Sequence, residues 1–520
     1  MATLAVTTVL QLVVVNYWPG FASPNERARA YQALALANQG TLAIDRELAR
    51  FGSMEDVACH GGRCFPNKAP GLLPLVLPAA WLAQLGGGES VSALRWTLYG
   101  GRLLASSLPF VLTVVLLVHL VVPAFPRGGP FAVAAYALAT PALPASLLLF
   151  SHAFTALCLL AAYWLLTAER EVGLPRAALA GFLLGWGVTA EYPVAVPALV
   201  LAGAALPRLR WRGAAAAIAG AFPPLALLGV YNAACFGAPF SVSSAHEANA
   251  TFASLSSRGL FGISWPEPWS LVGLLLSPMR GVLVWAPVLA VALAVMLRGC
   301  PRPRVPGALG LASLALAVLL SGYPNWHGGW FPGPRYLLPA LPLLSVATAA
   351  GSEWVLERRW GRALASAAAA WGCVAAFGSL ATFPFPPDDF PVPWATFSFP
   401  LAAEGIHAPS WLPGGLVLPL FALLGLGGVL LVVLLASGRN RAAGALALAS
   451  LAVAVSLTLR VAPPSMWRAT LERAVVHDVY AGGRPGSLEA LVATPGISAR
   501  QGAEVEAWIA RRRTLQLAAR

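Results

Sequence analysis

Two residues of a long polar stretch, which runs from Ser23 to Gly71, have side chains suited to acid–base and anion chemistry. Glu26 lies near the start of this stretch and Lys68 near its end, and Lys68 is the only lysine among 34 lysines and arginines. A carboxylate can accept a proton, and a compact ammonium differs from an arginine fork as a partner for anions. Glu26 and Lys68 are therefore the first candidates for a site, although chance alone can also explain a single lysine.

A purely structural interpretation of Glu26 is also open. The run SPNE at 23–26 has the pattern of a capping box, with serine at the N-cap, proline in the first turn and glutamate at the third helical position. Such a pattern marks the start of a helix whether or not the glutamate does chemistry. The helix that follows is predicted to lie along a membrane surface on the face formed by Tyr31, Leu34, Ala35 and Asn38.

Four other ionisable residues lie at or beside apolar segments, where an ionisable group is costly and therefore a candidate for function. They are His152, Glu191, His327 and Arg335. The alternative for His152 and Glu191 is a paired structural role, and for His327 it is a place in the interfacial aromatic belt. Arg335 begins an apolar run on the side that carries few arginines, which favours a function. Lys68 has the alternative of snorkelling at the head of the next apolar segment.

Two further pairs carry weaker signals. His246 and Glu247 are predicted to lie in an outer loop, where contact with a substrate and simple solvation are both open. Asp388 and Asp389 stand among prolines, which favours a solvated turn over a metal site. Because the sequence has no DxD motif and no His/Cys cluster with metal-ligand spacing, we expect no essential metal.

The composition indicates which kind of fold must position these residues. The chain has 520 residues, of which 58% are hydrophobic and 11% charged, with a mean hydropathy of +0.71. That is too little polar surface for a soluble protein of this size, so we expect an all-α polytopic membrane protein with about 11–13 transmembrane helices. Residues 1–462 are expected to form the membrane domain, with juxtamembrane helices in a first outer loop at 20–70, and 463–520 a soluble helical tail.

The arginines cluster in short loops between apolar segments, at 207–212, 298–305, 357–362 and 438–441. This positive-inside pattern argues against a nucleic-acid-binding surface, despite a formal net charge of +13. It places three loops rich in Trp, Pro and Gly on the outer face, namely 232–270, 323–333 and 384–414.

Two apolar segments need separate treatment. The first, near 3–18, lacks a basic n-region and a small-residue cleavage site, so we expect a retained membrane anchor. The run 177–206 has Glu191 and Pro193 near its centre. It is expected to form either one long pass or two short helices that meet at the outer surface.

Cys59 and Cys64 flank Gly61-Gly62, which predicts a two-residue hairpin turn with the two cysteines directly opposite each other. This spacing suits a disulfide, which would place the loop on the oxidising side of the membrane. A reduced cross-strand pair is the alternative.

The order of these features resembles the first outer loop of the GT-C superfamily of membrane glycosyltransferases, in particular the bacterial family 39 and aminoarabinose-transferase-like enzymes. In that family an Asp-Glu pair follows the first span, and a Lys-Pro-Pro-Leu run precedes the second. The matching residues here are Asn25-Glu26 and Lys68-Ala69-Pro70-Gly71, so Asn25 replaces the first acid. His152, in SHAFTALCLLAAYWLL, stands where the family has an aspartate. The blocks NAACFGAPF, SPMRGVLVWAPV and NWHGGWFPGPRYLLPALP extend the likeness from about residue 10 to about residue 350.

The resemblance implies a GT-C-type helical bundle and an inverting transfer, without a cofactor, of a sugar from a polyprenyl-phosphate donor held in the membrane lipid. The acceptor would be a glycan, lipid or protein. Glu26 would be the catalytic base, and Lys68 and Arg335 would stabilise the departing phosphate. His327, His152 and Glu191 are the other candidates for substrate binding. The site would lie on the periplasmic face of a bacterial inner membrane.

Two other functions fit the same features. A transporter or flippase of a lipid-linked intermediate would share broken helices and intramembrane ionisable groups, although its charges would lie nearer the middle of the membrane. A GT-C relative that binds donor without transferring sugar would explain Asn25 and His152.

Overall fold

The protein is described by a computed structural model over residues 23–87, 90–168, 171–298, 307–382, 385–386, 392–403, 414–438, 442, 444–449 and 451–452. Within these residues the regular structure is helical apart from one two-stranded antiparallel sheet. The predicted anchor near 3–18, the pair Asp388-Asp389 and the predicted tail at 463–520 lie outside them.

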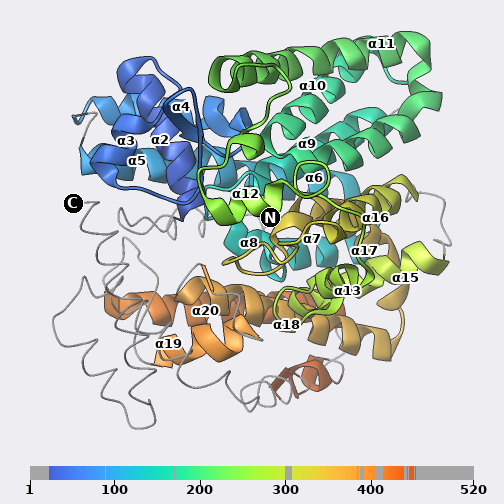
Figure 1. Ribbon diagram of the computed structural model, residues 1–520. Helices are drawn as coiled ribbons and strands as arrows, with labels where there is room; N and C mark the ends of the chain where they lie inside the picture. Colours follow the sequence, from blue (N-terminus) through green and yellow to red (C-terminus); the bar gives the residue numbers. More distant parts are fainter. Residues whose placement is uncertain are drawn as a thin grey trace.

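The first outer loop and the helices that follow it form a compact group, drawn in blue at one end of the molecule (Figure 1). Its elements are α2 (Pro24–Gln39), α3 (Asp45–Phe51), β1 (Val57–His60), β2 (Arg63–Pro66), η1 (Pro70–Leu72), α4 (Leu73–Gln84) and α5 (Val91–Arg102).

Helix α2 begins at the predicted capping box. The Ser23 side chain accepts a hydrogen bond from the Glu26 backbone N–H, and the Glu26 carboxylate accepts one from the Ser23 backbone N–H. The helix ends at Gly40, which adopts the left-handed conformation at φ 66°. Tyr31 and Leu34 are fully buried, so this face of α2 packs against other parts of the protein.

The predicted hairpin is confirmed. Cys59 pairs directly with Cys64 across β1 and β2, and the two are joined by a disulfide. The turn residues Gly61 and Gly62 have φ values of 59° and 75°, which residues other than glycine rarely adopt.

The next elements form the first half of the helical bundle. They are η2 (Leu103–Ser107), α6 (Leu108–Val121), α7 (Gly128–Leu138), α8 (Ala142–Ala145), α9 (His152–Thr167), α10 (Leu174–Ala190), η3 (Tyr192–Val194) and α11 (Ala195–Phe236). Helix α5 continues through η2 into α6, which gives one apolar helix of 31 residues.

The segment 177–206 is two helices, and the break falls at Glu191. Helix α10 ends at Ala190, Glu191 is extended (φ −154°, ψ 104°), and α11 starts after a short 3-10 turn. Within α11 the helical conformation is broken again at Arg210, so this element consists of two helices. The second of them packs closely on α10. The lack of a side chain at Gly181 permits this approach, since a Cβ there would collide with the Ala217 backbone.

The second half of the chain completes the bundle. Its elements are η4 (Ser243–His246), α12 (Ala250–Ser256), α13 (Pro268–Leu276), α14 (Val282–Trp285), η5 (Pro287–Leu289), α15 (Ala290–Arg298), α16 (Gly307–Ser321), η6 (Arg335–Ala340), α17 (Leu341–Val355), α18 (Arg359–Ala381), η7 (Trp394–Ser398), α19 (Phe399–Ala403) and α20 (Gly414–Ser437).

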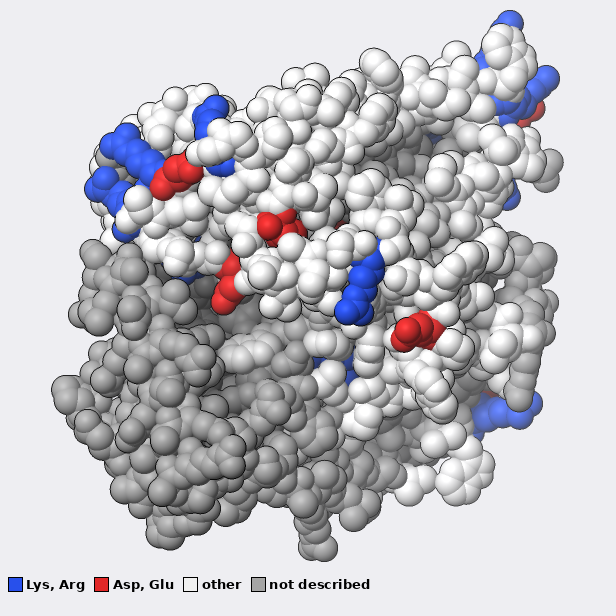
Figure 2. Space-filling model, viewed as in Figure 1, with Lys and Arg blue, Asp and Glu red and all other residues white. Residues whose placement is uncertain are grey.

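Ten of the described helical stretches are apolar enough to lie in a membrane. Four are also long enough to cross one, namely Val91–Val121, Tyr192–Phe236 with its break at Arg210, Arg359–Ala381 and Leu416–Ser437. The six shorter ones are Pro70–Gln84, Gly128–Leu138, His152–Thr167, Leu174–Ala190, Pro287–Leu297 and Gly307–Ser321. Lysines and arginines gather over the first outer loop and over the far end of α11, and most of the surface between them is uncharged (Figure 2). The predicted all-α polytopic membrane fold is confirmed.

Candidate functional site

Glu26 lies in the first turn of α2 and is fully buried, with 0% of its surface exposed. One carboxylate oxygen, Oε1, accepts hydrogen bonds from Arg102 Nε at 2.8 Å and from the Leu149 backbone N–H at 2.9 Å. The other, Oε2, accepts from the Ser23 backbone N–H at 3.1 Å and from its hydroxyl at 3.3 Å. Arg102 is itself only 2% exposed. The glutamate therefore ties α2 to α5 and to the loop before α9.

These contacts bear on the predicted role of Glu26 as catalytic base. A base must lie within hydrogen-bond reach of the proton that it removes. Both oxygens of Glu26 already have two donors each, and no part of the side chain is open to solvent. A substrate hydroxyl would have to displace one of these donors. The geometry therefore favours the structural alternative, in which Glu26 is a cap and half of a buried ion pair.

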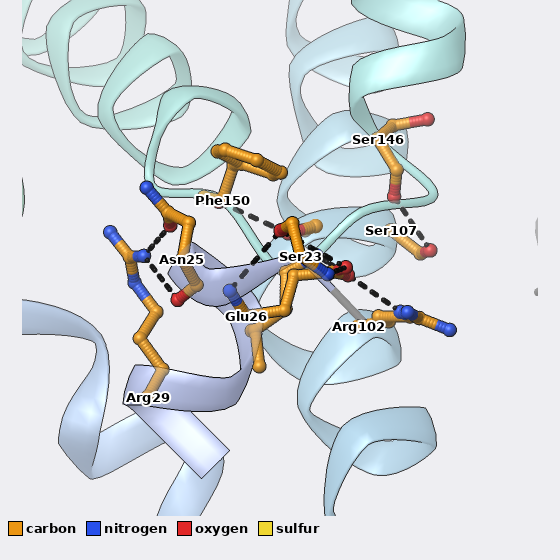
Figure 3. A network of polar contacts seen from close by, with 10 residues as sticks. Ser23, Asn25, Glu26, Arg29, Arg102, Ser107, Ser146 and Phe150 are labelled. Atoms are coloured by element: carbon orange, nitrogen blue, oxygen red, sulfur yellow. Dashed lines mark hydrogen bonds and ion pairs between the residues drawn. The ribbon is translucent and has the colours of Figure 1, made fainter. Parts of the chain in front are cut away.

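The opposite side of the same helical turn faces a different set of residues. Figure 3 shows Glu26 and Arg102 on one side of the start of α2, and Asn25 with Arg29 on the other. Arg29 Nη1 donates to both the backbone and side-chain oxygens of Asn25. Its Nε is buried and has no hydrogen-bond partner among the described residues. Burial lowers the pKa of Arg29 to about 10, so the side chain is charged at neutral pH.

Lys68 pairs with a carboxylate that the sequence did not single out. Its Nζ lies 3.0 Å from Asp56 Oδ1, and the two side chains are 23% and 9% exposed. Asp56 precedes β1 and Lys68 follows β2, so the hairpin brings the pair together.

His152 and Glu191 lie side by side where α9 begins and α10 ends. His152 Nδ1 is 3.7 Å from Glu191 Oε2, which is too long for a hydrogen bond, and Nδ1 has no hydrogen-bond partner among the described residues. The hydroxyl of Ser151 donates to the same glutamate oxygen. Glu191 is 21% exposed by side chain against 3% for His152. The sequence predicted both residues separately, and the fold places them next to each other.

Arg335, the first residue of η6, lies among aromatic rings. Its guanidinium carbon is 4.6 Å from the ring centre of Tyr336 and 5.6 Å from that of Phe150. Its Nη2 donates to the Tyr336 hydroxyl at 2.6 Å, whereas its buried Nε has no hydrogen-bond partner among the described residues. Two arginines from distant parts of the chain, Arg29 and Arg335, thus each have an unused buried donor.

We group these residues as one candidate site on electrostatic grounds. The charges of Glu191, Asp56 and Arg335 all act on the guanidinium of Arg29, and those of Glu191 and Asp56 act on Arg335. Both arginines also act on His152. We call the set the outer polar site, and its members are Arg29, Asp56, Lys68, His152, Glu191 and Arg335.

His327 makes local contacts in the loop before η6. Its Nδ1 accepts a hydrogen bond from the Gly329 backbone N–H at 3.2 Å, and its ring lies edge-on to Trp326 with the centres 5.8 Å apart. These contacts fit a loop-forming residue, and its predicted role in substrate binding stays a prediction. No group of three or more His, Cys, Asp or Glu side chains with metal-binding geometry occurs in the part of the chain that the structure describes.

Sequence reasoning missed Arg29, Asp56 and Tyr336. A signal for Arg29 was present, because it lies four residues after Asn25 and so shares a helical face with the residue aligned to the family acid. Asp56 is one acid among several in the polar stretch, and only the hairpin register brings it near Lys68. Tyr336 follows Arg335 directly and carried no separate signal.

Comparisons with known proteins found no matching family model and no matching curated protein. The solved structures that are similar to this chain include the following two. The crystal structure of ArnT from Cupriavidus metallidurans in the apo state has 15% sequence identity and a TM-score of 0.47, over 91% of this chain and 79% of that one. The cryo-EM structure of the arabinosyltransferase EmbB from Mycobacterium smegmatis has 13% identity and a TM-score of 0.42, over 98% of this chain and 42% of that one. This chain thus spans less than half the length of EmbB.

Proposed function

We propose that this chain is a membrane glycosyltransferase that moves a sugar from a polyprenyl-phosphate donor to an acceptor at the outer, periplasmic face of a bacterial inner membrane. The observation that carries the proposal is the pair of buried donors, Arg29 Nε and Arg335 Nε, which have no hydrogen-bond partner among the described residues. Buried polar groups are nearly always hydrogen-bonded, so these two guanidinium donors suit an anionic ligand.

The chemistry of the donor matches these cations. The polyprenyl chain lies in the bilayer, while the sugar-bearing phosphate lies at the interface where the first outer loop meets the helices. When the bond between the anomeric carbon and the phosphate oxygen breaks, the phosphate gains a negative charge. Fixed cations that already face it stabilise that charge more than the ground state. Arg29, Lys68 and Arg335 would act in this way, with Asp56 holding Lys68 in place.

The other members of the site fit the sugar. Glu191 is part-exposed at the break between α10 and α11, and a carboxylate there can accept hydrogen bonds from sugar hydroxyls. The His152 Nδ1 beside it supplies a further polar contact. A flippase would also bind a lipid phosphate, but the charges gather beside the first outer loop, at one end of the helices, as expected for chemistry at the membrane surface.

The test is transfer of radiolabelled sugar from a panel of polyprenyl-phosphate donors in membranes that carry the native chain or a variant. The variant Arg335→Gln removes the charge of a site residue, and Arg258→Gln is a matched control, since Arg258 is exposed in an outer loop. We expect transfer by the native chain and by Arg258→Gln, and loss in Arg335→Gln of on the order of a hundredfold or more. Donor that crosses the membrane with its label still on the lipid would indicate a flippase, and donor binding without transfer would indicate a non-catalytic relative.

A further inference from the structure

The outer loop at 237–250, which contains η4, is fixed to the hairpin of the first outer loop. Glu247 forms an antiparallel bridge with Ala58, and the Ala248 backbone N–H donates to the Val57 carbonyl at 2.9 Å. Figure 1 shows this green part of the chain, after α11, running beside the blue first outer loop. The backbone at Glu247 is therefore held in place by an added strand-like contact and does not sample solvent freely.

The carboxylate of Glu247 is held on one side. Its Oε2 accepts a hydrogen bond from Asn67 Nδ2 at 2.8 Å, and the Asn67 carbonyl accepts one from the Ser243 hydroxyl at 2.9 Å. Among the described residues the other oxygen, Oε1, has no hydrogen-bond donor. The side chain is part-buried, so one oxygen is fixed and the other is available to a ligand. Glu26, in contrast, has donors on both oxygens.

Glu247 borders the outer polar site. The charges of Lys68 and Asp56 act on it, and Lys68 follows Asn67 directly in the chain. From the other side, the phenol of Tyr323 is subject to the charges of both Arg335 and Glu247. The carboxylate thus lies beside the Asp56–Lys68 pair, on a loop that is fixed to the hairpin.

We propose that Glu247 is the general base of the sugar transfer, in place of Glu26. This inference rests on the proposed function. In the step, the acceptor hydroxyl gives its proton to Glu247 Oε1 while its oxygen forms a bond to the anomeric carbon of the sugar. The bond from that carbon to the phosphate oxygen breaks, and the electron pair leaves with polyprenyl phosphate. Glu247 then releases the proton to water.

The surroundings of Glu247 suit a base at neutral pH. The pKa of its carboxyl is raised to about 7, chiefly by burial and also by the charge of Asp56, against the lowering effects of the Asn67 hydrogen bond and of Lys68. The other titratable groups nearby are Tyr323 and His246, and the His246 ring contacts that of His60 at 4.7 Å. A general base is most effective when its pKa lies near the working pH. Transfer should therefore rise with pH through about 7 and level off above it.

The experiment compares transfer from a polyprenyl-phosphate donor, across pH 5 to 9, by membranes carrying the native chain, Glu247→Gln, Glu247→Ala or Glu267→Gln. Glu267 is the matched control, because it is an exposed acid of the neighbouring outer segment. We expect Glu247→Gln to lose about 10²- to 10⁴-fold in rate, to lose the rise near pH 7, and to bind polyprenyl phosphate like the native chain. Added formate should restore part of the activity of Glu247→Ala, because it can replace the missing carboxylate.

Three results would overturn the assignment. Native-rate transfer by Glu247→Gln would exclude Glu247 as the base while leaving the proposed function intact. Loss of activity together with loss of polyprenyl-phosphate binding, without rescue by formate, would make Glu247 a structural residue of the loop. Absence of transfer by the native chain from every donor would remove the proposed function and the base with it.

Discussion

Removal of Arg102 should destabilise the protein strongly, because it leaves the Glu26 carboxylate buried without its counter-charge. The two side chains are 2% and 0% exposed and lie 2.8 Å apart. Breaking a buried ion pair by removing one partner typically costs about 3–5 kcal/mol. Arg102→Met should fall in this range, since methionine fills a similar space but donates no hydrogen bond.

The size of the effect can be expressed as a melting temperature. One kcal/mol shifts the melting temperature of a domain of roughly 150–250 residues by about 2–4 °C, and the shift shrinks as the chain lengthens. For a chain of 520 residues we take roughly half that sensitivity, which gives a fall of roughly 3–10 °C for Arg102→Met.

The assay can use the chain's own thiols. Cys158, Cys235 and Cys373 are buried and free, so a thiol-reactive fluorophore reports unfolding of the detergent-solubilised protein on heating. The double variant Glu26→Gln/Arg102→Met should recover part of the lost stability, because it no longer buries an unpaired charge. The exposed pair Arg127–Glu357 supplies the control, and Arg127→Met should change little. If Arg102→Met melted with the native chain, the structural role given to Glu26 would be refuted.

Three further predictions concern the same end of the molecule. Gly71→Ala should impair folding, because a Cβ there would collide with the backbone of Thr189 and Ala190. The yield of folded protein on size-exclusion chromatography measures this effect, and a yield equal to that of the native chain would contradict the close packing. Replacing both Cys59 and Cys64 by serine should lower the free energy of unfolding by about 2 kcal/mol, since the disulfide closes only a short loop and so removes little entropy from the unfolded chain. The thiol assay should therefore show a small fall in melting temperature, and a large fall would contradict this reasoning. Binding of polyprenyl phosphate should weaken by about tenfold or more in Arg29→Gln, because the variant removes a buried cation whose Nε has no hydrogen-bond partner among the described residues, and unchanged affinity would argue against Arg29 as a ligand.

Local patterns in the sequence predicted those parts of the fold that depend on neighbouring residues. The capping box and the hairpin with Cys59 opposite Cys64 each follow from the residues within a few positions, and the helix break at Glu191 was one of the two outcomes expected from Glu191 and Pro193. The membrane character followed from composition, because apolar segments of sufficient length have few other stable environments. These features need no knowledge of the tertiary structure.

The candidate site could be predicted only in part, because its members meet through tertiary packing. Arg29 and Arg335 are separated by most of the described chain, and no pattern in either segment indicates that both act on Glu191. The pairing of Glu26 with Arg102 also required the structure, since it depends on how α2 packs on α5. The sequence identified Glu26 as important but could not distinguish a buried ion pair from a catalytic base.

The most direct test of the central claim is the appearance of free polyprenyl phosphate, measured by mass spectrometry, when a polyprenyl-phosphate sugar is supplied to membranes containing the chain. The account predicts that polyprenyl phosphate accumulates in step with loss of sugar from the lipid, and that accumulation nearly stops in Arg335→Gln but not in Arg258→Gln. Donor that remains intact with the native chain, or release that is equal in Arg335→Gln, would contradict it.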